Sequence, residues 1–227
     1  MLKHTNIVTK WIYAVVRNTI VWWMAEVPYL LLMFVGIGAK SAGEIGTLVL
    51  AAVGLFPFVL MPGLLASLGV AREFYRNGNE FPLFSTFFHF YRREYKNAMK
   101  IGTIEAVLIA AFYTSYVYYS RIFGALIGMP FLLLLLLSLF FSLFLLALLA
   151  DRQLPLIGYF QTAGLLMIRH PVLIVSMVFE IFLLFYLAIA YLPALLLFVC
   201  PGTTFLLVTH FYRECVKQEE EKGTLID

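Results

Sequence analysis

The sequence is poor in charged residues for its length. Asp, Glu, Lys and Arg make up 13% of the 227 residues, whereas hydrophobic residues make up 63%. A soluble domain carries about 25% charged residues, and at this size it has too little interior to bury so much apolar surface. We therefore expect an integral membrane protein that crosses the bilayer several times. The net charge of +3 is too small for a nucleic-acid-binding domain.

The sequence also has too few cysteines for a disulfide framework. Cys200 and Cys215 are the only two, and they stand 15 residues apart on what is expected to be one helix. At a rise of ~1.5 Å per residue their Cα atoms would lie ~22 Å apart, far beyond the reach of a disulfide. Two unpaired thiols are expected.

Motifs of catalysis and nucleotide binding are absent as well. The chain contains no phosphate-binding loop, no His-Glu-x-x-His and no Gly-x-Ser-x-Gly. The four histidines have no second ligand at a spacing typical of metal sites; they are His4, His89, His170 and His210. We expect a non-enzymatic chain that binds no metal, cofactor, nucleotide or nucleic acid.

Long apolar runs predict six membrane-spanning helices. They lie at 19–39, 46–70, 101–119, 122–150, 172–190 and 193–211. Alternating short and long connections arrange them as three helical hairpins. With both termini in the cytoplasm, 14 of the 16 basic residues fall on the inner side, and only Lys40 and Arg121 fall outside. Cytoplasmic loops show this bias. The predicted fold class is an all-α membrane protein with interfacial amphipathic helices.

An amphipathic helix is predicted over 81–97, in the first long inner connection. Aromatic residues recur on one side at helical spacing, namely Phe84, Phe87, Phe88, Tyr91 and Tyr95. Basic residues take the other side, namely Arg92, Arg93 and Lys96. The rings are expected to insert into lipid or against a partner. The basic residues either hold anionic lipid head groups or an acidic partner, or only set the topology.

Within one transmembrane domain, 1–227, a threefold repeat is expected over 5–76, 81–152 and 154–213. Each unit has a basic residue followed by a hydrogen-bonding residue, then an apolar helix that contains one glutamate. The matched segments are Arg17-Asn18 with Glu26, Lys96-Asn97 with Glu105, and Arg169-His170 with Glu180. The segments 62–63 and 201–202 are both Pro-Gly, and 74–76 and 211–213 are both Phe-Tyr-Arg.

Glu26, Glu105 and Glu180 are the acidic residues inside the predicted spans. A carboxylate at mid-bilayer costs ~2.5–3.5 kcal/mol on the insertion scale, so it normally faces protein or a wet cavity. One hypothesis is a coupling-proton or ligand site near the pseudo-threefold axis, for which Glu180 is the strongest candidate because it is deepest. The other is that each glutamate is protonated or paired and hydrogen-bonds between helices.

Several short motifs resemble the YesL-like family of small bacterial membrane proteins. They are Pro62-Gly63 through Arg72 and Tyr75, Phe84 to Phe88, Arg93 to Asn97, Arg169-His170-Pro171, and Pro201-Gly202 with Phe211-Tyr212-Arg213. The resemblance implies a multi-pass protein of the bacterial cell membrane that takes part in carbohydrate uptake. It implies no catalytic residues.

The first functional hypothesis is a non-catalytic accessory subunit beside the pore subunits of an ATP-driven oligosaccharide importer. The second is a small stand-alone secondary transporter that uses the buried glutamates. The third is a scaffold that organises membrane lipids.

Overall fold

The computed structural model describes residues 2–78 and 80–223, and all regular structure within these ranges is helical. The first half of the chain forms α1 (Leu2–Ala25), α2 (Val27–Ile37), α3 (Ala42–Leu55), a π-helical turn η1 (Phe56–Leu60), α4 (Met61–Asn77) and α5 (Leu83–Arg93). The second half forms α6 (Tyr95–Phe123), α7 (Ala125–Asp151), α8 (Leu156–Arg169), α9 (Pro171–Tyr191), α10 (Ala194–Phe198) and α11 (Cys200–Glu221).

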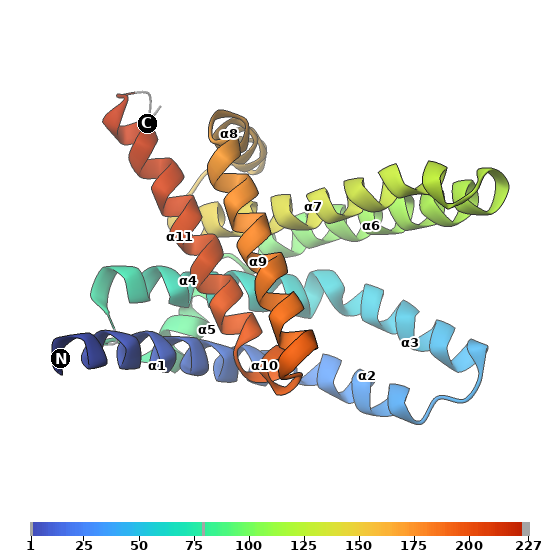
Figure 1. The fold of residues 1–227 in the computed structure, drawn as a ribbon, viewed down its shortest axis with the longest axis horizontal. Coiled ribbons are helices and arrows are strands. Elements are labelled where there is room, and N and C mark those ends of the chain that lie inside the picture. Colours follow the sequence, from blue (N-terminus) through green and yellow to red (C-terminus); the bar gives the residue numbers. More distant parts are fainter. Residues whose placement is uncertain (1, 79, 224–227) are drawn as a thin grey trace.

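The centre of the molecule is built from α4, α7 and α11, the helices that return to the inner side in the three predicted hairpins. α4 packs against both α7 and α11, and it also contacts α1 and α5. The buried positions of these three helices run almost without a break over 61–71, 144–150 and 204–206. Figure 1 shows that the α2–α3 and α6–α7 pairs project from this centre in the same direction.

Two prolines in the first half of the chain have different effects on the helices. The chain bends by 73° between α1 and α2, at Glu26, and Pro28 follows within the first turn of α2. A proline at this point removes an amide donor, and its ring would clash with the preceding turn of a continued helix. Pro57 is instead accommodated inside a continuous helix by the π-helical turn η1. Such turns insert one extra residue and relieve the clash.

Four helices are long and apolar enough to cross a membrane, which fits a multi-pass membrane protein. They are Gly43–Asn77, Tyr95–Phe123, Ala125–Asp151 and Pro171–Tyr191, and the bent pair Thr9–Ala25 and Val27–Ile37 makes a fifth if it counts as one span. The prediction of six spans is not confirmed. Its last span, 193–211, is divided between the short α10 and α11, and α11 continues into the polar residues that end at Glu221.

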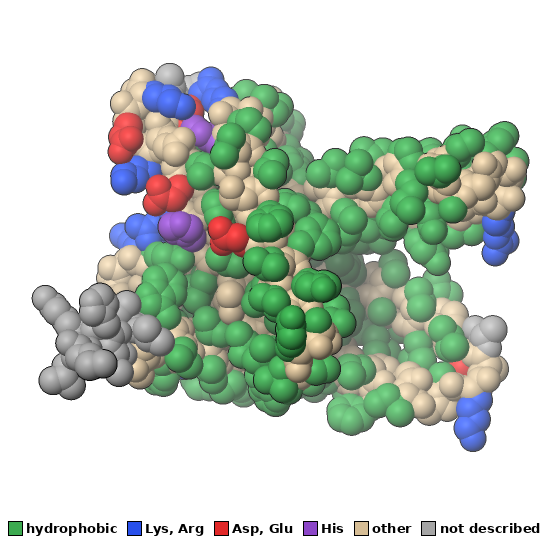
Figure 2. All heavy atoms as spheres, in the orientation of Figure 1, with side chains coloured by type: hydrophobic (Ala, Val, Ile, Leu, Met, Phe, Trp, Pro, Cys, Tyr) green, Lys and Arg blue, Asp and Glu red, His purple; other side chains and the backbone are tan. Residues whose placement is uncertain are grey.

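Charged side chains collect at one end of the molecule. Figure 2 shows acidic, basic and histidine side chains gathered around the C-terminal half of α11. One basic side chain stands at the tip of each projecting pair, where the sequence has Lys40 and Arg121. The fold thus separates the two basic residues expected on the outer side from the charged end.

Candidate functional site

Glu26 is enclosed where α1 meets α4. Its side chain has no exposed surface, and neither carboxylate oxygen has a hydrogen-bond partner in the described part of the chain. A Cβ atom on Gly63 would lie 2.2 Å from Oε1 of Glu26, so the absence of a side chain there makes room for the carboxylate. Two turns earlier, the amide of Asn18 donates to the Ser67 carbonyl of α4 at 3.0 Å. A polar face of α1 therefore packs on α4.

Glu105 is buried between α6 and α7. Its two carboxylate oxygens accept hydrogen bonds from Ser138 at 2.9 Å and from Ser142 at 2.7 Å. The side chain is 3% exposed, and both hydroxyls belong to the helix that packs along α6. This geometry is that of hydrogen bonding between helices.

Glu180 lies on the surface, near the middle of α9. It is exposed, and no hydrogen bond or ion pair joins it to another described residue. Its neighbours Phe179 and Phe182 are exposed apolar side chains, at 64% and 50%. A lone carboxylate thus stands in the apolar outer surface of a helix that is long enough to span a membrane.

The three glutamates do not form a common site. Glu26 packs on α4, Glu105 pairs with α7, and Glu180 faces outward from α9. The described residues contain no group of three carboxylate, histidine or cysteine side chains close enough to hold a metal ion. The structure therefore gives each glutamate a separate environment, and the returning helices α4, α7 and α11 form the centre of the fold.

The aromatic residues of α5 divide between the interior and the surface. Phe84 and Phe88 are about half exposed, as expected for a helix that lies in the interface, but Phe87 is completely buried. Phe87 and Phe90 pack with Val21 of α1 and with Val70 of α4. The prediction that Phe87 inserts into lipid or a partner is wrong, because α4 and α1 cover that side of the helix. The helix also ends at Arg93, earlier than the predicted 81–97.

The basic residues after Phe88 have different roles. Arg92 and Lys96 are exposed. Arg93 donates to the carbonyl of Ala150 at the end of α7, at 3.3 Å, and lies 3.3 Å from the carboxylate of Glu94. Arg93 therefore links the residues just before α6 to the C-terminal end of α7.

Arg17 and Arg169 also make contacts over long distances in the sequence, but with partners of different kinds. Arg17 donates to the carbonyl of Phe81, just beyond α4, at 3.2 Å. Arg169 forms an ion pair with Glu219 in α11, and Nε2 of His170 lies 2.9 Å from the same carboxylate. Arg17, Arg93 and Arg169 are spaced 76 residues apart in both intervals. The predicted repeat, which places Lys96 in line with Arg17 and Arg169, stays a prediction.

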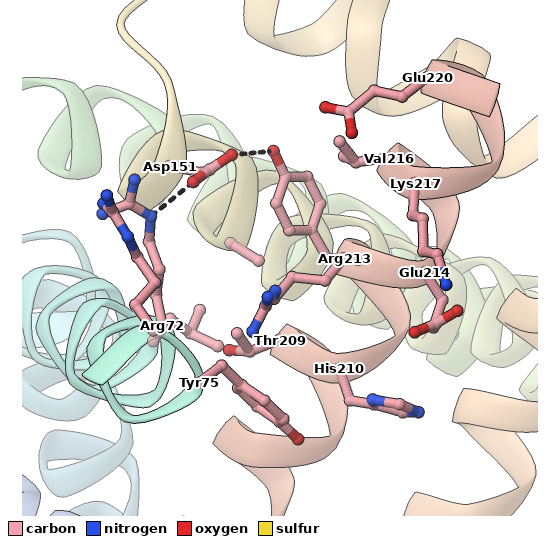
Figure 3. A pocket seen from close by; sticks show the side chains of 14 residues that line it. Arg72, Tyr75, Asp151, Thr209, His210, Arg213, Glu214, Val216, Lys217 and Glu220 are labelled. Atoms are coloured by element: carbon pink, nitrogen blue, oxygen red, sulfur yellow. Dashed lines mark hydrogen bonds and ion pairs between the residues drawn. The ribbon is translucent and has the colours of Figure 1, made fainter. Parts of the chain in front are cut away.

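The inner ends of α4, α7 and α11 meet in a network of polar side chains (Figure 3). The Arg72 guanidinium of α4 pairs with one oxygen of Asp151, and the Tyr212 hydroxyl of α11 donates to the other at 3.0 Å. Burial, and next the Asp151 carboxylate, raises the pKa of Tyr212, so the phenol keeps the proton that it donates. One carboxylate thereby joins all three returning helices.

A cavity of about 590 Å³ opens beside this network. Its walls come from the three returning helices, and its polar lining includes Arg72, Arg76, Thr209, Arg213 and Lys217. The ring of Tyr75 lies under the Arg213 guanidinium, 5.1 Å away, and its hydroxyl donates to the Leu206 carbonyl at 3.1 Å. This is a preformed, partly enclosed polar site with several guanidinium groups.

A family model described as "Protein of unknown function, DUF624" matches residues 20–116. The match begins in the second half of α1 and ends within α6, so it covers less than half of the chain. It includes Glu26, Arg72, Arg93 and Glu105. No match was found among curated proteins or among solved structures.

Sequence reasoning missed the network at the inner ends of the helices. In the sequence, Arg72 belongs to the basic residues of the inner side and Tyr212 to a repeated Phe-Tyr-Arg segment, and no motif marks Asp151. A signal did exist, because the three residues occupy the C-terminal ends of three predicted return helices that must lie on the same side of the membrane. Their pairing requires that these helices touch, which the periodicity of each helix does not reveal.

Proposed function

We propose that this chain is a non-catalytic subunit of a larger membrane assembly and that α9 contacts the partner. The observation that supports the proposal is the exposed, unpaired carboxylate of Glu180 on an apolar spanning helix. A carboxylate that faces lipid costs ~2.5–3.5 kcal/mol on the insertion scale, whereas one that faces a neighbouring helix can be hydrogen-bonded. A partner helix that offers a hydroxyl, amide or cationic group would remove this cost.

The proposed partner is a pore subunit of an ATP-driven oligosaccharide importer in the bacterial cell membrane. This part rests on the resemblance to the YesL-like family, which falls within the wider DUF624 family whose model matches residues 20–116. The chain would contribute no chemistry of its own. It would stabilise or orient the pore subunits through contacts inside the membrane.

We further propose that the chain crosses the membrane six times, with both ends in the cytoplasm. The bent α1–α2 pair would provide the first crossing, and α10 with the apolar half of α11 would provide the last. The gathering of charged side chains at one end of the fold supports this arrangement (Figure 2).

Two variants of Glu180 test the partner contact. Glu180→Gln keeps the size and much of the hydrogen-bonding capacity, so we expect importer subunits to co-purify and oligosaccharide-dependent growth to continue. Glu180→Leu removes the polar group, so co-purification should fall several-fold while the abundance of the chain is unchanged. Glu80→Leu removes an exposed carboxylate that, like Glu180, has no side-chain partner among the described residues, and it serves as the matched control. Unchanged recovery of importer subunits with Glu180→Leu would refute the contact.

A secondary transporter is the second candidate, and Glu26 is the observation in its favour. Both of its oxygens are buried without a hydrogen-bond partner in the described chain, as expected for a carboxylate that takes up and releases a proton. Glu26→Gln cannot release a proton, so a transporter would lose uptake at normal abundance. An accessory subunit would keep it. We expect uptake to continue.

A further inference from the structure

The inner cavity has more cationic groups than its own carboxylates neutralise. Arg72 is already paired with Asp151 and, at 3.2 Å, with Glu73, and both oxygens of Asp151 are engaged by Arg72 and Tyr212. Arg76 reaches Glu73 only at 4.0 Å and is 57% exposed. No described carboxylate lies within ion-pair distance of Arg213.

Arg213 is held in position by a ring contact and not by an ion pair with a described residue. Its guanidinium lies over the ring of Tyr75, which is itself fixed by the hydrogen bond to Leu206. Figure 3 shows this guanidinium extending toward α4 and Arg72, while the carboxylate of Glu214 extends to the opposite side of α11. A guanidinium that is stacked in this way keeps its planar fork of donors free for a ligand.

We propose that this cavity binds a phosphate group, with Arg213 and Arg76 as its principal ligands and Arg72 behind them. Guanidinium groups bind phosphate through paired, charge-assisted hydrogen bonds, and several of them converge here from two helices. The volume of about 590 Å³ is ample for a phosphorylated head group or a sugar phosphate.

Two sources offer the same chemistry at this place. Basic pockets between membrane helices on the cytoplasmic side hold the head groups of anionic phospholipids. A soluble phosphomonoester could enter the same opening from the cytoplasm. Glu214 and Glu220 also line the cavity, on the α11 wall, and they would repel an anion that lies nearer to them than to Arg213.

The site differs from the predicted head-group site on α5. There, Arg92 and Arg93 line a shallower hollow with Phe88 and His89, and Arg93 is engaged by Ala150 and Glu94. Arg121 offers a matched control, since it is an exposed arginine that lines neither the inner cavity nor the hollow on α5. The proposal does not depend on a partner at Glu180, so the chain alone can be tested.

The experiment measures binding to the full-length chain purified in an uncharged detergent. One arm uses dihexanoyl phosphatidylglycerol and the other uses glucose 6-phosphate, each followed by equilibrium dialysis and by the thermal unfolding midpoint. Binding to the native state raises that midpoint in proportion to ln(1 + [L]/Kd). Binding of the lipid alone identifies a head-group site, and binding of glucose 6-phosphate identifies a site open to soluble phosphates.

Arg213→Gln is expected to weaken binding at least about tenfold, because an amide cannot replace a charge-assisted pair of hydrogen bonds. Arg121→Gln should leave the Kd unchanged. Arg76→Gln gives a second test with the same expectation if Arg213→Gln does not fold. Absence of binding in both arms, or an equal loss with Arg121→Gln, would overturn the proposal.

Discussion

At the scale of single residues, the three glutamates of the predicted spans lie in three different environments. Glu105 accepts two hydroxyl hydrogen bonds, Glu26 is enclosed with no donor among the described residues, and Glu180 is exposed on an apolar helix. The cost of a carboxylate in a membrane depends on such partners and not on depth alone. Replacement of each glutamate is therefore expected to have a different effect on the stability of the protein.

Replacement of Glu105 by Leu should destabilise the isolated chain. Ser142 would lose its partner in a buried position, at a cost of about 1 kcal/mol if the hydroxyl turns to the preceding helical turn. The measurement is the thermal unfolding midpoint in detergent. The double variant Glu105→Leu/Ser142→Ala should recover part of the loss, because neither partner is then left unpaired.

Glu180→Leu is the matched comparison for this stability measurement. It removes an exposed carboxylate that makes no described contact, so the midpoint of the isolated chain should not fall. A larger loss with Glu180→Leu than with Glu105→Leu would contradict the assignment of the two environments.

Cys215 is expected to be chemically inert in the folded protein. Burial, and next the carboxylates of Glu214 and Glu219, raises the pKa of its thiol to about 12. Only the thiolate reacts, so at pH 8 the native chain should react about a thousandfold more slowly than an unperturbed thiol with a pKa of about 8.5. The rate should increase about tenfold for each pH unit up to about pH 12.

The measurement uses a thiol-reactive dye and a chain that carries Cys200→Ser, which leaves Cys215 as the reporter. The same chain unfolded in dodecyl sulfate gives the unperturbed rate. Rapid labelling of the native chain at pH 8 would show that α11 does not bury this position. Both thiols are free in the structure, as the sequence predicts.

At the scale of the helices, close approach is made possible by glycine. A Cβ atom on Gly202 would lie 2.3 Å from the backbone oxygen of Val15, and the amide of Gly202 donates to the Thr19 hydroxyl at 3.0 Å. Because α1 would have to move as a whole, Gly202→Ala should cost about 1–3 kcal/mol. Nothing lies within 4 Å of a Cβ on Gly54, so Gly54→Ala is the control and should be neutral or stabilising.

The stability of both alanine variants can be compared through their unfolding midpoints in detergent. Gly63→Ala should fall between them, because its clash is with the movable end of the Glu26 side chain and not with backbone. An equal effect at Gly202 and Gly54 would mean that α1 and α11 are not in contact as described.

The helices themselves could largely be predicted from the sequence, but not what covers them. The aromatic side of 81–97 was recognised from its spacing, and α5 does occupy most of that range. Periodicity tells which residues share a side, whereas burial depends on the neighbouring helix. Phe87 is therefore buried under α4 and α1, although Phe84 three residues earlier is exposed.

At the scale of the whole molecule, the threefold repeat stays a prediction. The match of Lys96 to Arg17 and Arg169 followed from the asparagine that comes after it, since the composition around each basic residue is similar. The equal 76-residue spacing of Arg17, Arg93 and Arg169 instead favours Arg93 at this position. The contacts of these arginines are long-range, and a single sequence does not specify them.

The number and direction of the crossings lead to the last prediction. In a background that carries Cys200→Ser and Cys215→Ala, Arg121→Cys places a thiol at the tip of the α6–α7 pair and Lys222→Cys places one just beyond α11. Six crossings with the charged end inside predict that an impermeant maleimide labels position 121, but not 222, in intact cells. Permeabilised cells should label at both positions.

The two positions are matched because both are exposed and basic in the native chain. Labelling of both in intact cells would mean that the tail beyond α11 lies outside, so that α10 and α11 together do not return the chain to the cytoplasm. Labelling of position 222 alone would mean that the protein has the opposite orientation in the membrane, with the inner cavity open to the exterior. Basic residues are strongly enriched in cytoplasmic loops, and Lys40 and Arg121 lie apart from the charged end of the fold. We therefore expect labelling at position 121 alone.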